Sequence, residues 1–320
     1  MKINTIKPKL TLIATIAFLS TTGCVANPLD NRNATVTVRV VDDENNPVQN
    51  VLSSVYHQNT YKAISGMTDT NGMYSVFLND IWAEIIGSFK KDGYYNSKGV
   101  IWNWGMGKGA LIPPADTNFT VVLKRIINPV PSGKKDVVAR FPRLGAPIGY
   151  DLEIGDWVFP DGKGKNADML LTAEGFYNDR RDYSFQMSIE FTGEFNGIQS
   201  FHYPQDGVGA LLRSELPPPA VAPELGYVKT VNGFAHCLPP ARWGASPLDK
   251  NRKWIFRIRT EVDDDGNVVS ANYGWMFDDI IFGINSSLGI PCIMLKYYHN
   301  PNPHSHSLEP KEIADRQNRD

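Results

Sequence analysis

Residues 183–191 read Tyr-Ser-Phe-Gln-Met-Ser-Ile-Glu-Phe, with apolar and polar side chains alternating along the stretch. A period of two places the apolar side chains on one face, as in a half-buried β-strand. Residues 254–262 repeat the pattern, and the acidic turn 263–267 then leads into strand-like residues 268–270, which predicts a hairpin. No stretch of the sequence has the apolar spacing and end caps of a long helix. The sequence therefore predicts an all-β protein.

Composition limits the number of domains and the kinds of partner. The chain has 320 residues, of which 42% are hydrophobic and 21% are charged, as in globular proteins. Domains typically have about 100–200 residues, so we expect two. The formal net charge of −2 at pH 7 gives no broad basic surface, and we therefore expect no nucleic-acid partner.

The N-terminus has the pattern of an export signal. Residues 1–9 contain three lysines and no acid, and residues 10–20 form an apolar-rich stretch that is followed by small residues. A membrane-spanning helix needs about 20 apolar residues, so this stretch is too short to span a bilayer. Its length instead suits the apolar region of a secretory signal peptide.

The end of this segment, Gly23-Cys24, resembles the lipobox of bacterial lipoproteins, although Thr21 stands where that family usually has an aliphatic residue. The resemblance implies that residues 1–23 are a signal peptide and that Cys24 carries the lipid. The protein would then be exported and anchored to a membrane of the bacterial cell envelope through that lipid. The alternatives are ordinary cleavage near Ala26 and an uncleaved anchor.

Residues 35–127 resemble the carboxypeptidase regulatory-like domain. The resemblance rests on four ordered elements, V-x-V-x-V-x-D, N-P-V, T-D-x-N-G-x-Y and K-D-G-Y-Y, whose matching residues are Val36, Val38, Val40, Asp42, Pro47, Val48, Thr68, Asp69, Asn71, Gly72, Tyr74, Lys91, Asp92, Gly93 and Tyr94. It implies an immunoglobulin-like or transthyretin-like β-sandwich that serves as a structural or binding accessory, with no catalytic residues. The Asn71-Gly72 pair itself predicts a tight hairpin between two short strands, and Trp82–Ile86 suggests one turn of helix.

The rest of the chain divides at its proline-rich segments. Residues 24–34 read as a polar tether, and residues 128–133 as an extended linker between domains. The β-rich residues 134–298 predict a second sandwich or a jelly roll. Within it, the prolines of 211–223 predict a long surface loop, and residues 299–320 are expected to form a flexible tail.

Three tryptophans are candidate ligand-binding residues. Trp102 and Trp104 lie two residues apart in a glycine-rich segment, and Trp243 lies in the second domain. Exposed tryptophan rings stack on sugars or dock against partner proteins. The alternative is that these rings fill the ends of the sandwiches.

The candidate catalytic residues are carboxylates of the second domain, namely Asp151, Glu153, Asp156 and Glu190. Two carboxylates about 5–10 Å apart across a sugar would support glycoside hydrolysis. The acidic residues 151–168 could instead bind Ca²⁺ through carboxylate oxygens, or they could form solvated turns. No metal centre is predicted, because the His304-x-His306 pair lacks further ligands at recognisable spacing.

Two cysteines remain if Cys24 carries a lipid. Outside the cytoplasm Cys237 and Cys292 could form one disulfide, or both could be buried free thiols. The sequence has no G-x-S-x-G, S-x-x-K or H-E-x-x-H motif. It therefore favours a non-catalytic binding or structural module, with a polysaccharide or another envelope protein as partner. The alternative is an extracellular glycosidase-like hydrolase that uses paired carboxylates of the second domain.

Overall fold

The computed structural model describes residues 33–57, 62–79, 84–102, 117–203, 211–240, 242–249, 251–285 and 287–317. The chain divides into two units, Met1–Asn31 and Arg32–Asp320, and every described residue belongs to the second. The expected signal peptide, Cys24 and Trp104 lie outside the described residues, as does the side chain of Trp102. Among the described residues, no helix is long and apolar enough to cross a membrane.

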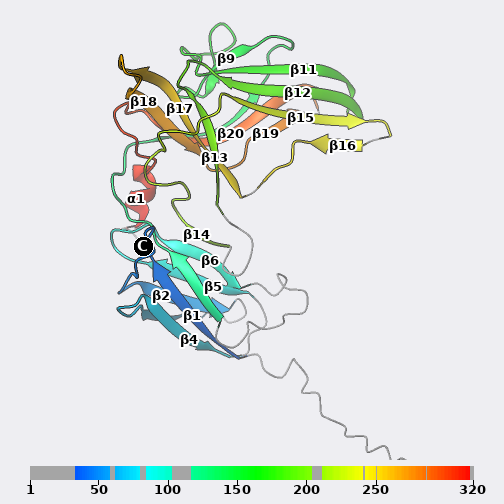
Figure 1. The fold of residues 1–320 in the computed structure, drawn as a ribbon. Helices are drawn as coiled ribbons and strands as arrows, with labels where there is room; N and C mark the ends of the chain where they lie inside the picture. The colour runs from blue at the N-terminus through cyan, green and yellow to red at the C-terminus, as the bar shows by residue number, and fades with distance from the viewer. Residues whose placement is uncertain are drawn as a thin grey trace, which may run out of the picture. The chain divides into compact units, whose positions relative to one another are not determined.

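The first part of this unit is a β-sandwich, which confirms the predicted fold class (Figure 1). One sheet has the order β4–β1–β7 and the other the order β14–β6–β5–β2–β3. Alternate valines of the predicted strand 35–41 are buried between the two sheets, among them Val36, Val38 and Val40. The strands are β1 (Ala34–Val41), β2 (Leu52–His57), β3 (Ile64–Met67), β4 (Met73–Leu78), β5 (Ile85–Lys90), β6 (Ser97–Trp102), β7 (Thr117–Val122) and β14 (Leu211–Ser214).

The predicted surface loop 211–223 is wrong in its first residues. Its β14 segment pairs antiparallel with β6, with Ser214 opposite Ser97, and so becomes the edge strand of the first sandwich. Leu216, just after the strand, is fully buried. An unpaired strand edge exposes backbone donors and acceptors, and here a segment from the second half of the sequence satisfies those of β6.

The turn at Asn71-Gly72 is present, but the predicted hairpin is wrong. Strands β3 and β4 belong to different sheets, so the turn carries the chain from one sheet to the other. The Asp69 carboxylate accepts hydrogen bonds from the backbone N–H groups of Asn71 and Met73, at 2.9 and 2.8 Å. Gly72 has a φ of +72°, where a side chain would be strained. The expected helical turn also fails where it is described, because Ile85 and Ile86 lie in β5.

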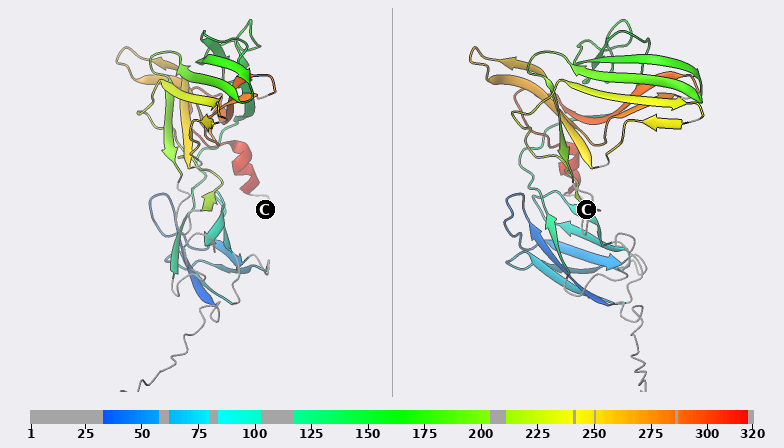
Figure 2. Two further views of the ribbon diagram at one scale, coloured as in Figure 1. Left: turned by 90° about the vertical axis from the view of Figure 1, so that its right-hand side faces the viewer. Right: turned by 45° about the vertical axis from the view of Figure 1, so that its right-hand side comes forward.

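The second domain is also a sandwich (Figure 2). One sheet has the order β10–β9–β11–β12–β15–β16, and the other has the order β13–β17–β18–β20–β19, with β8 also paired to β20. The strands are β8 (Gly133–Arg140), β9 (Ile148–Asp151), β10 (Asp156–Trp157), β11 (Met169–Asp179), β12 (Asp182–Phe191), β13 (Gly197–His202), β15 (Thr230–Leu238), β16 (Arg242–Ala245), β17 (Arg252–Val262), β18 (Val268–Met276), β19 (Ile281–Asn285) and β20 (Ile290–Asn300).

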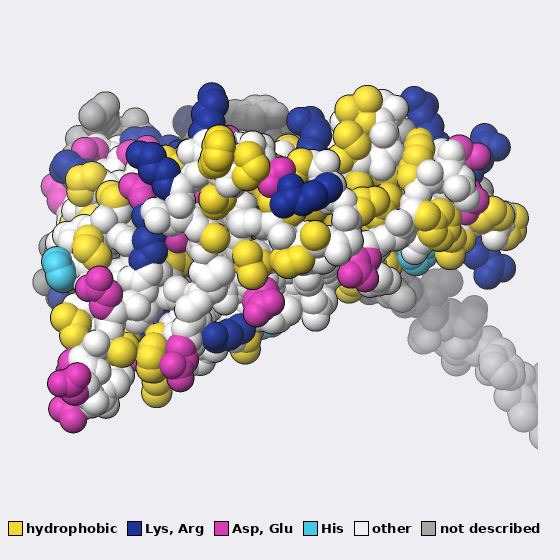
Figure 3. Space-filling model, turned by 90° about the horizontal axis from the view of Figure 1, so that it is seen from above, with side chains coloured by type: hydrophobic (Ala, Val, Ile, Leu, Met, Phe, Trp, Pro, Cys, Tyr) yellow, Lys and Arg dark blue, Asp and Glu magenta, His cyan; other side chains and the backbone are white. Residues whose placement is uncertain are grey.

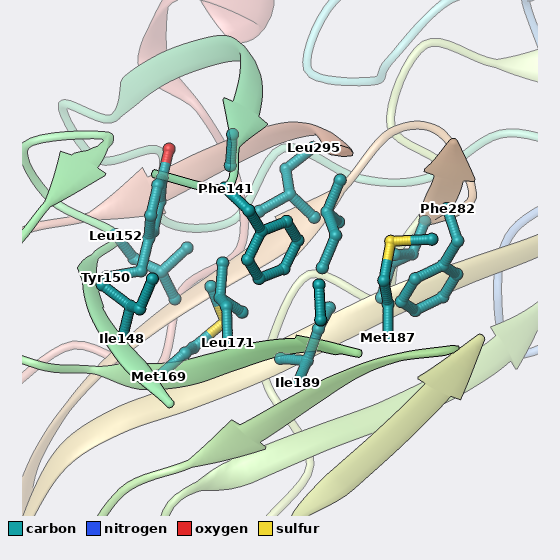
Figure 4. Close-up of a cluster of buried hydrophobic side chains, with 14 of the residues drawn as sticks. Phe141, Ile148, Tyr150, Leu152, Met169, Leu171, Met187, Ile189, Phe282 and Leu295 are labelled. Atoms are coloured by element: carbon teal, nitrogen blue, oxygen red, sulfur yellow. The ribbon is translucent and has the colours of Figure 1, made fainter. Parts of the chain in front are cut away.

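The core of this sandwich follows the predicted alternation. On β12, Phe185, Met187, Ile189 and Phe191 are buried in one cluster with side chains of the facing sheet. Figure 4 shows part of that cluster, in which Phe282 of β19 lies beside Met187. The predicted hairpin at 263–267 is confirmed, since Val262 pairs with Val268.

The C-terminal segment is ordered, so the predicted flexible tail 299–320 is wrong for its described residues. Strand β20 continues to Asn300, and helix α1 (Lys311–Gln317) buries Ile313. The fully buried Glu309 accepts a hydrogen bond at 3.0 Å from the backbone N–H of Ile127, just before the predicted linker. Two contacts therefore hold the C-terminal segment in place: the burial of its apolar side chains, and the hydrogen bond that Glu309 accepts from the backbone beside the linker.

Candidate ligand-binding groove

Two of the candidate catalytic carboxylates lie beside the same arginine. Asp151 ends β9 and Glu153 lies two residues after it, and both contact the guanidinium of Arg259 on β17, as does the buried Asp168. Arg259 Nε and Nη2 donate to the two oxygens of Asp168 at 2.9 and 3.0 Å, which makes a bidentate pair. A single arginine thus gathers three carboxylates from one acidic segment.

Burial and hydrogen bonding set the ionisation of this cluster. Burial opposes the charged form of Asp151, but backbone N–H donors from Lys165, Asn166 and Ile154, together with Arg259, bring its pKa below the usual value. Burial raises the pKa of Asp168, and Arg259 offsets part of that effect. The balance therefore favours the charged form of Asp151, whereas at Asp168 burial outweighs the contribution of Arg259.

This geometry favours a structural role over hydrolysis. Both oxygens of Asp151 accept backbone hydrogen bonds, so neither is free to attack a substrate or transfer a proton. Asp156 accepts hydrogen bonds from the backbone of Trp157 and Lys163. Glu190 is exposed between two core residues of β12, on the outer face of its sheet. The structure therefore does not gather the four predicted carboxylates into one site.

Arg259 supplies positive charge where the sequence suggested Ca²⁺. Among the described residues, no group of three or more His, Cys, Asp or Glu side chains is arranged to hold a metal ion. Of the two histidines in the His-x-His pair, His306 packs on the ring of Tyr273 and His304 is exposed. Sequence reasoning missed the part played by Arg259, which lies about 90–110 positions from its partners.

A third histidine, His299, is buried near the Arg259 cluster. Its Nε2 atom has no hydrogen-bond partner in the described part of the chain. Burial lowers its pKa to about 4, because the charged imidazolium would lose its hydration. At neutral pH this imidazole is therefore uncharged.

The two cysteines are free in the structure, which matches the free-thiol alternative and not the disulfide. Cys237 lies on β15 and Cys292 on β20, and both side chains are buried. Burial raises the pKa of the Cys292 thiol. A buried, protonated thiol is a poor nucleophile.

Trp243 borders an apolar groove. It lies on the edge strand β16, opposite Cys237 of β15, and its side chain therefore points to the inner side of the sheet. Nevertheless 73% of Trp243 is exposed, and a space lies between its strand and β19 of the facing sheet. The space next to it has a volume of about 420 Å³ and is lined largely by apolar side chains, including those of Leu248, Ile284 and Met294.

A second space continues the groove beyond Ser246 and Pro247. It has a volume of about 330 Å³ and shares Phe282 with the first. Its lining is more polar and includes Gln186 and the Arg252–Asp279 ion pair at 3.0 Å. The groove therefore joins an apolar end at Trp243 to a polar end at Arg252.

Figure 3 shows one face of the molecule, seen from above, with its side chains coloured by type. Lys and Arg side chains there are interspersed with Asp, Glu and hydrophobic side chains, and no single sign of charge covers the face. Of the three predicted ligand-binding tryptophans, only Trp243 has a described side chain. Trp254 and Trp275, by contrast, are buried.

Comparison with protein-family models gives no match, and comparison with curated proteins gives none either. The solved structures similar to this chain include the 3-chlorocatechol 1,2-dioxygenase of Rhodococcus opacus, with 14% identity over 30% of this chain and 61% of that one, and a TM-score of 0.25. They also include a streptococcal ancillary pilin, with 14% identity over 63% of this chain and 58% of that one, and a TM-score of 0.21. The major pilin subunit BcpA of Bacillus cereus has 12% identity over 82% of this chain and 95% of that one, with a TM-score of 0.20. The chain spans about three fifths of the length of the first two. TM-scores of this size carry no functional argument.

Proposed function

We propose that this chain is an exported, lipid-anchored protein of the bacterial cell envelope whose second sandwich is a non-catalytic binding module. The observation that carries the binding role is the exposed Trp243 ring beside an apolar groove. Exposed aromatic rings cost solvation free energy unless a partner covers them, and concave apolar sites are where small ligands and chain segments bind. Asp151 and Glu153, two carboxylates of the rival hydrolase, contact Arg259, and Asp151 also accepts hydrogen bonds from backbone donors.

The binding role is tested by titrating the full chain with candidate envelope polymers. Polysaccharide is the ligand class that the sequence suggests first. A ligand in the groove should shield Trp243 from acrylamide quenching of its fluorescence, and Trp243→Ala should remove that shielding and weaken binding about tenfold or more. Leu52→Ala, which removes an exposed side chain of the first sandwich, is the matched control. If every ligand that binds does so equally well to Trp243→Ala, the groove is not the site.

The lipid anchor is tested separately. Labelled fatty acid should be incorporated into the wild-type chain and not into Cys24→Ala. Equal labelling of both proteins would contradict the anchor and would leave the groove proposal standing.

A further inference from the structure

The groove beside Trp243 is bordered by an unpaired strand edge. Strand β19 has only β20 as a neighbour among the described strands. The lining of both spaces includes Phe282, and the apolar space also includes Gly283 and Ile284. The edge of β19 that β20 does not occupy therefore faces the groove.

The hydrogen-bonding pattern shows which backbone groups lie on that edge. The carbonyl oxygen of Pro291 accepts a hydrogen bond from Phe141 N, on the β8 side of β20. In an antiparallel ladder the N–H and C=O of one residue point to the same side, and the side alternates along the strand. Ile284 lies opposite Pro291, so its N–H and C=O point away from β20, and by the same alternation those of Phe282 do so too. No hydrogen bond joins these four groups to another described residue.

An unpaired edge of this kind is complementary to an extended polypeptide. Added strands gain affinity from main-chain hydrogen bonds and specificity from pockets for alternate side chains. The backbone groups of Phe282 and Ile284 offer two donors and two acceptors at the two-residue spacing of a β-ladder. The apolar space next to Trp243 can take one large apolar side chain of such a strand.

We propose that the groove binds an extended polypeptide segment, which adds as a strand to the free edge of β19 and places an apolar side chain next to Trp243. This inference rests on the proposed binding role of the groove and replaces carbohydrate with peptide as the ligand class. The aliphatic lining by Ile281, Ile284 and Met294 supports it, because such side chains offer no hydrogen bonds to the hydroxyl groups of a sugar.

The test selects nonapeptides from a displayed random peptide library by their binding to the full chain. Peptides that also bind the Trp243→Ala variant are removed by counter-selection. Enriched sequences should carry a large apolar residue and should alternate apolar with polar residues, as a strand does when one of its faces is covered. The best peptide is then synthesised with N-methyl groups on every second backbone nitrogen, in both registers. One register should weaken binding about tenfold and the other should have little effect, because only one set of N–H groups faces β19. This comparison uses wild-type protein, so it does not depend on a variant that folds.

A pair of variants tests the same bonds from the protein side. Ile284→Ala removes the side chain and keeps the backbone N–H, whereas Ile284→Pro also removes the N–H that faces the groove and spares the ladder with β20. We expect Ile284→Pro to bind the peptide about three- to tenfold more weakly than Ile284→Ala, as measured by fluorescence anisotropy.

The other outcomes separate the two proposals. Peptide binding that both N-methyl registers and Ile284→Pro leave unchanged would overturn strand addition. Trp243-dependent binding of a polysaccharide, without any Trp243-dependent peptide, would overturn the peptide and retain the groove. Trp243-dependent self-association in sedimentation would make a second copy of the chain the occupant and overturn a separate polypeptide segment as the ligand. Failure of both peptide and polysaccharide to bind at Trp243 would overturn both proposals.

Discussion

Arg259 balances the charge of three carboxylates in the second sandwich. Its φ of 53° lies in the left-handed region, which bulky side chains avoid, and the ladder of β17 with β18 shifts register at this point. The shift directs the side chain toward the acidic segment after β9. Backbone strain of about 1–3 kcal/mol persists where surrounding contacts hold the residue in place, and here those contacts are its three carboxylates.

Removal of this guanidinium should destabilise the domain strongly. Arg259→Met keeps most of the side-chain volume but leaves the buried Asp151 and Asp168 without their countercharge. We expect the free energy of unfolding to fall by about 3–5 kcal/mol in urea denaturation. Lys311→Met, which breaks the exposed Lys311–Asp315 pair, should cost less than about 0.5 kcal/mol. A similar small loss in both variants would show that Arg259 is not structural.

The buried imidazole of His299 should make the domain acid-sensitive. Its pKa falls from 6.5 in the unfolded chain to about 4 in the folded protein, so the unfolded chain binds more protons between these values. Stability therefore rises with pH through this window and is lost on acidification, by about 2 kcal/mol between pH 7 and pH 5. His299→Gln should remove that part of the pH dependence, as measured by urea unfolding at both pH values. An unchanged pH dependence in the variant would contradict the assignment.

At the scale of elements, β14 makes the first sandwich depend on the second half of the sequence. A fragment of residues 33–127 lacks this strand and exposes the edge of β6. We expect a synthetic peptide of residues 209–217 to stabilise that fragment by about 2 kcal/mol at saturation, as measured by urea unfolding, because it restores several backbone hydrogen bonds. A scrambled peptide is the control, and an equal effect of both peptides would contradict the pairing.

Elements whose signal is local were predictable from the sequence. The alternation in 183–191 and 254–262 requires only neighbouring residues, and both stretches are strands. The expected faces hold throughout 183–191, whereas in 254–262 they hold only as far as Ile258, because the ladder shifts register at Arg259. The donation of β14 and the packing of the C-terminal segment depend on partners about 100 or more positions away, and no local pattern encodes them. The same holds for the site. Trp243 was predictable as an exposed aromatic, but the free edge of β19 follows only from the order of strands in the folded sheet.

At the scale of the whole described unit, three kinds of contact join the two sandwiches. Strand β14 pairs with β6, the carboxylate of Glu309 binds the backbone before the linker, and a third apolar cluster includes Tyr95 of the first sandwich with Tyr273 and Ile313. Apolar burial and backbone pairing shared across a boundary make two parts unfold together. The segment 128–133 is therefore a bonded connection and not a free tether.

Glu309 is the member of this connection that a single substitution can remove. Its carboxylate accepts hydrogen bonds from the N–H groups of both Ile127 and Asn128, and Glu309→Ala leaves those donors unpaired at a cost of about 1–3 kcal/mol. In calorimetry the wild-type chain should unfold in one transition, and Glu309→Ala should broaden or split it, because the linkage between the sandwiches weakens. Glu309→Gln retains an acceptor oxygen and should behave nearly as wild type. Two separate transitions in the wild-type protein would contradict the coupling, since they would mean that the shared strand, the bound linker and the third cluster do not bind the sandwiches into one cooperative unit.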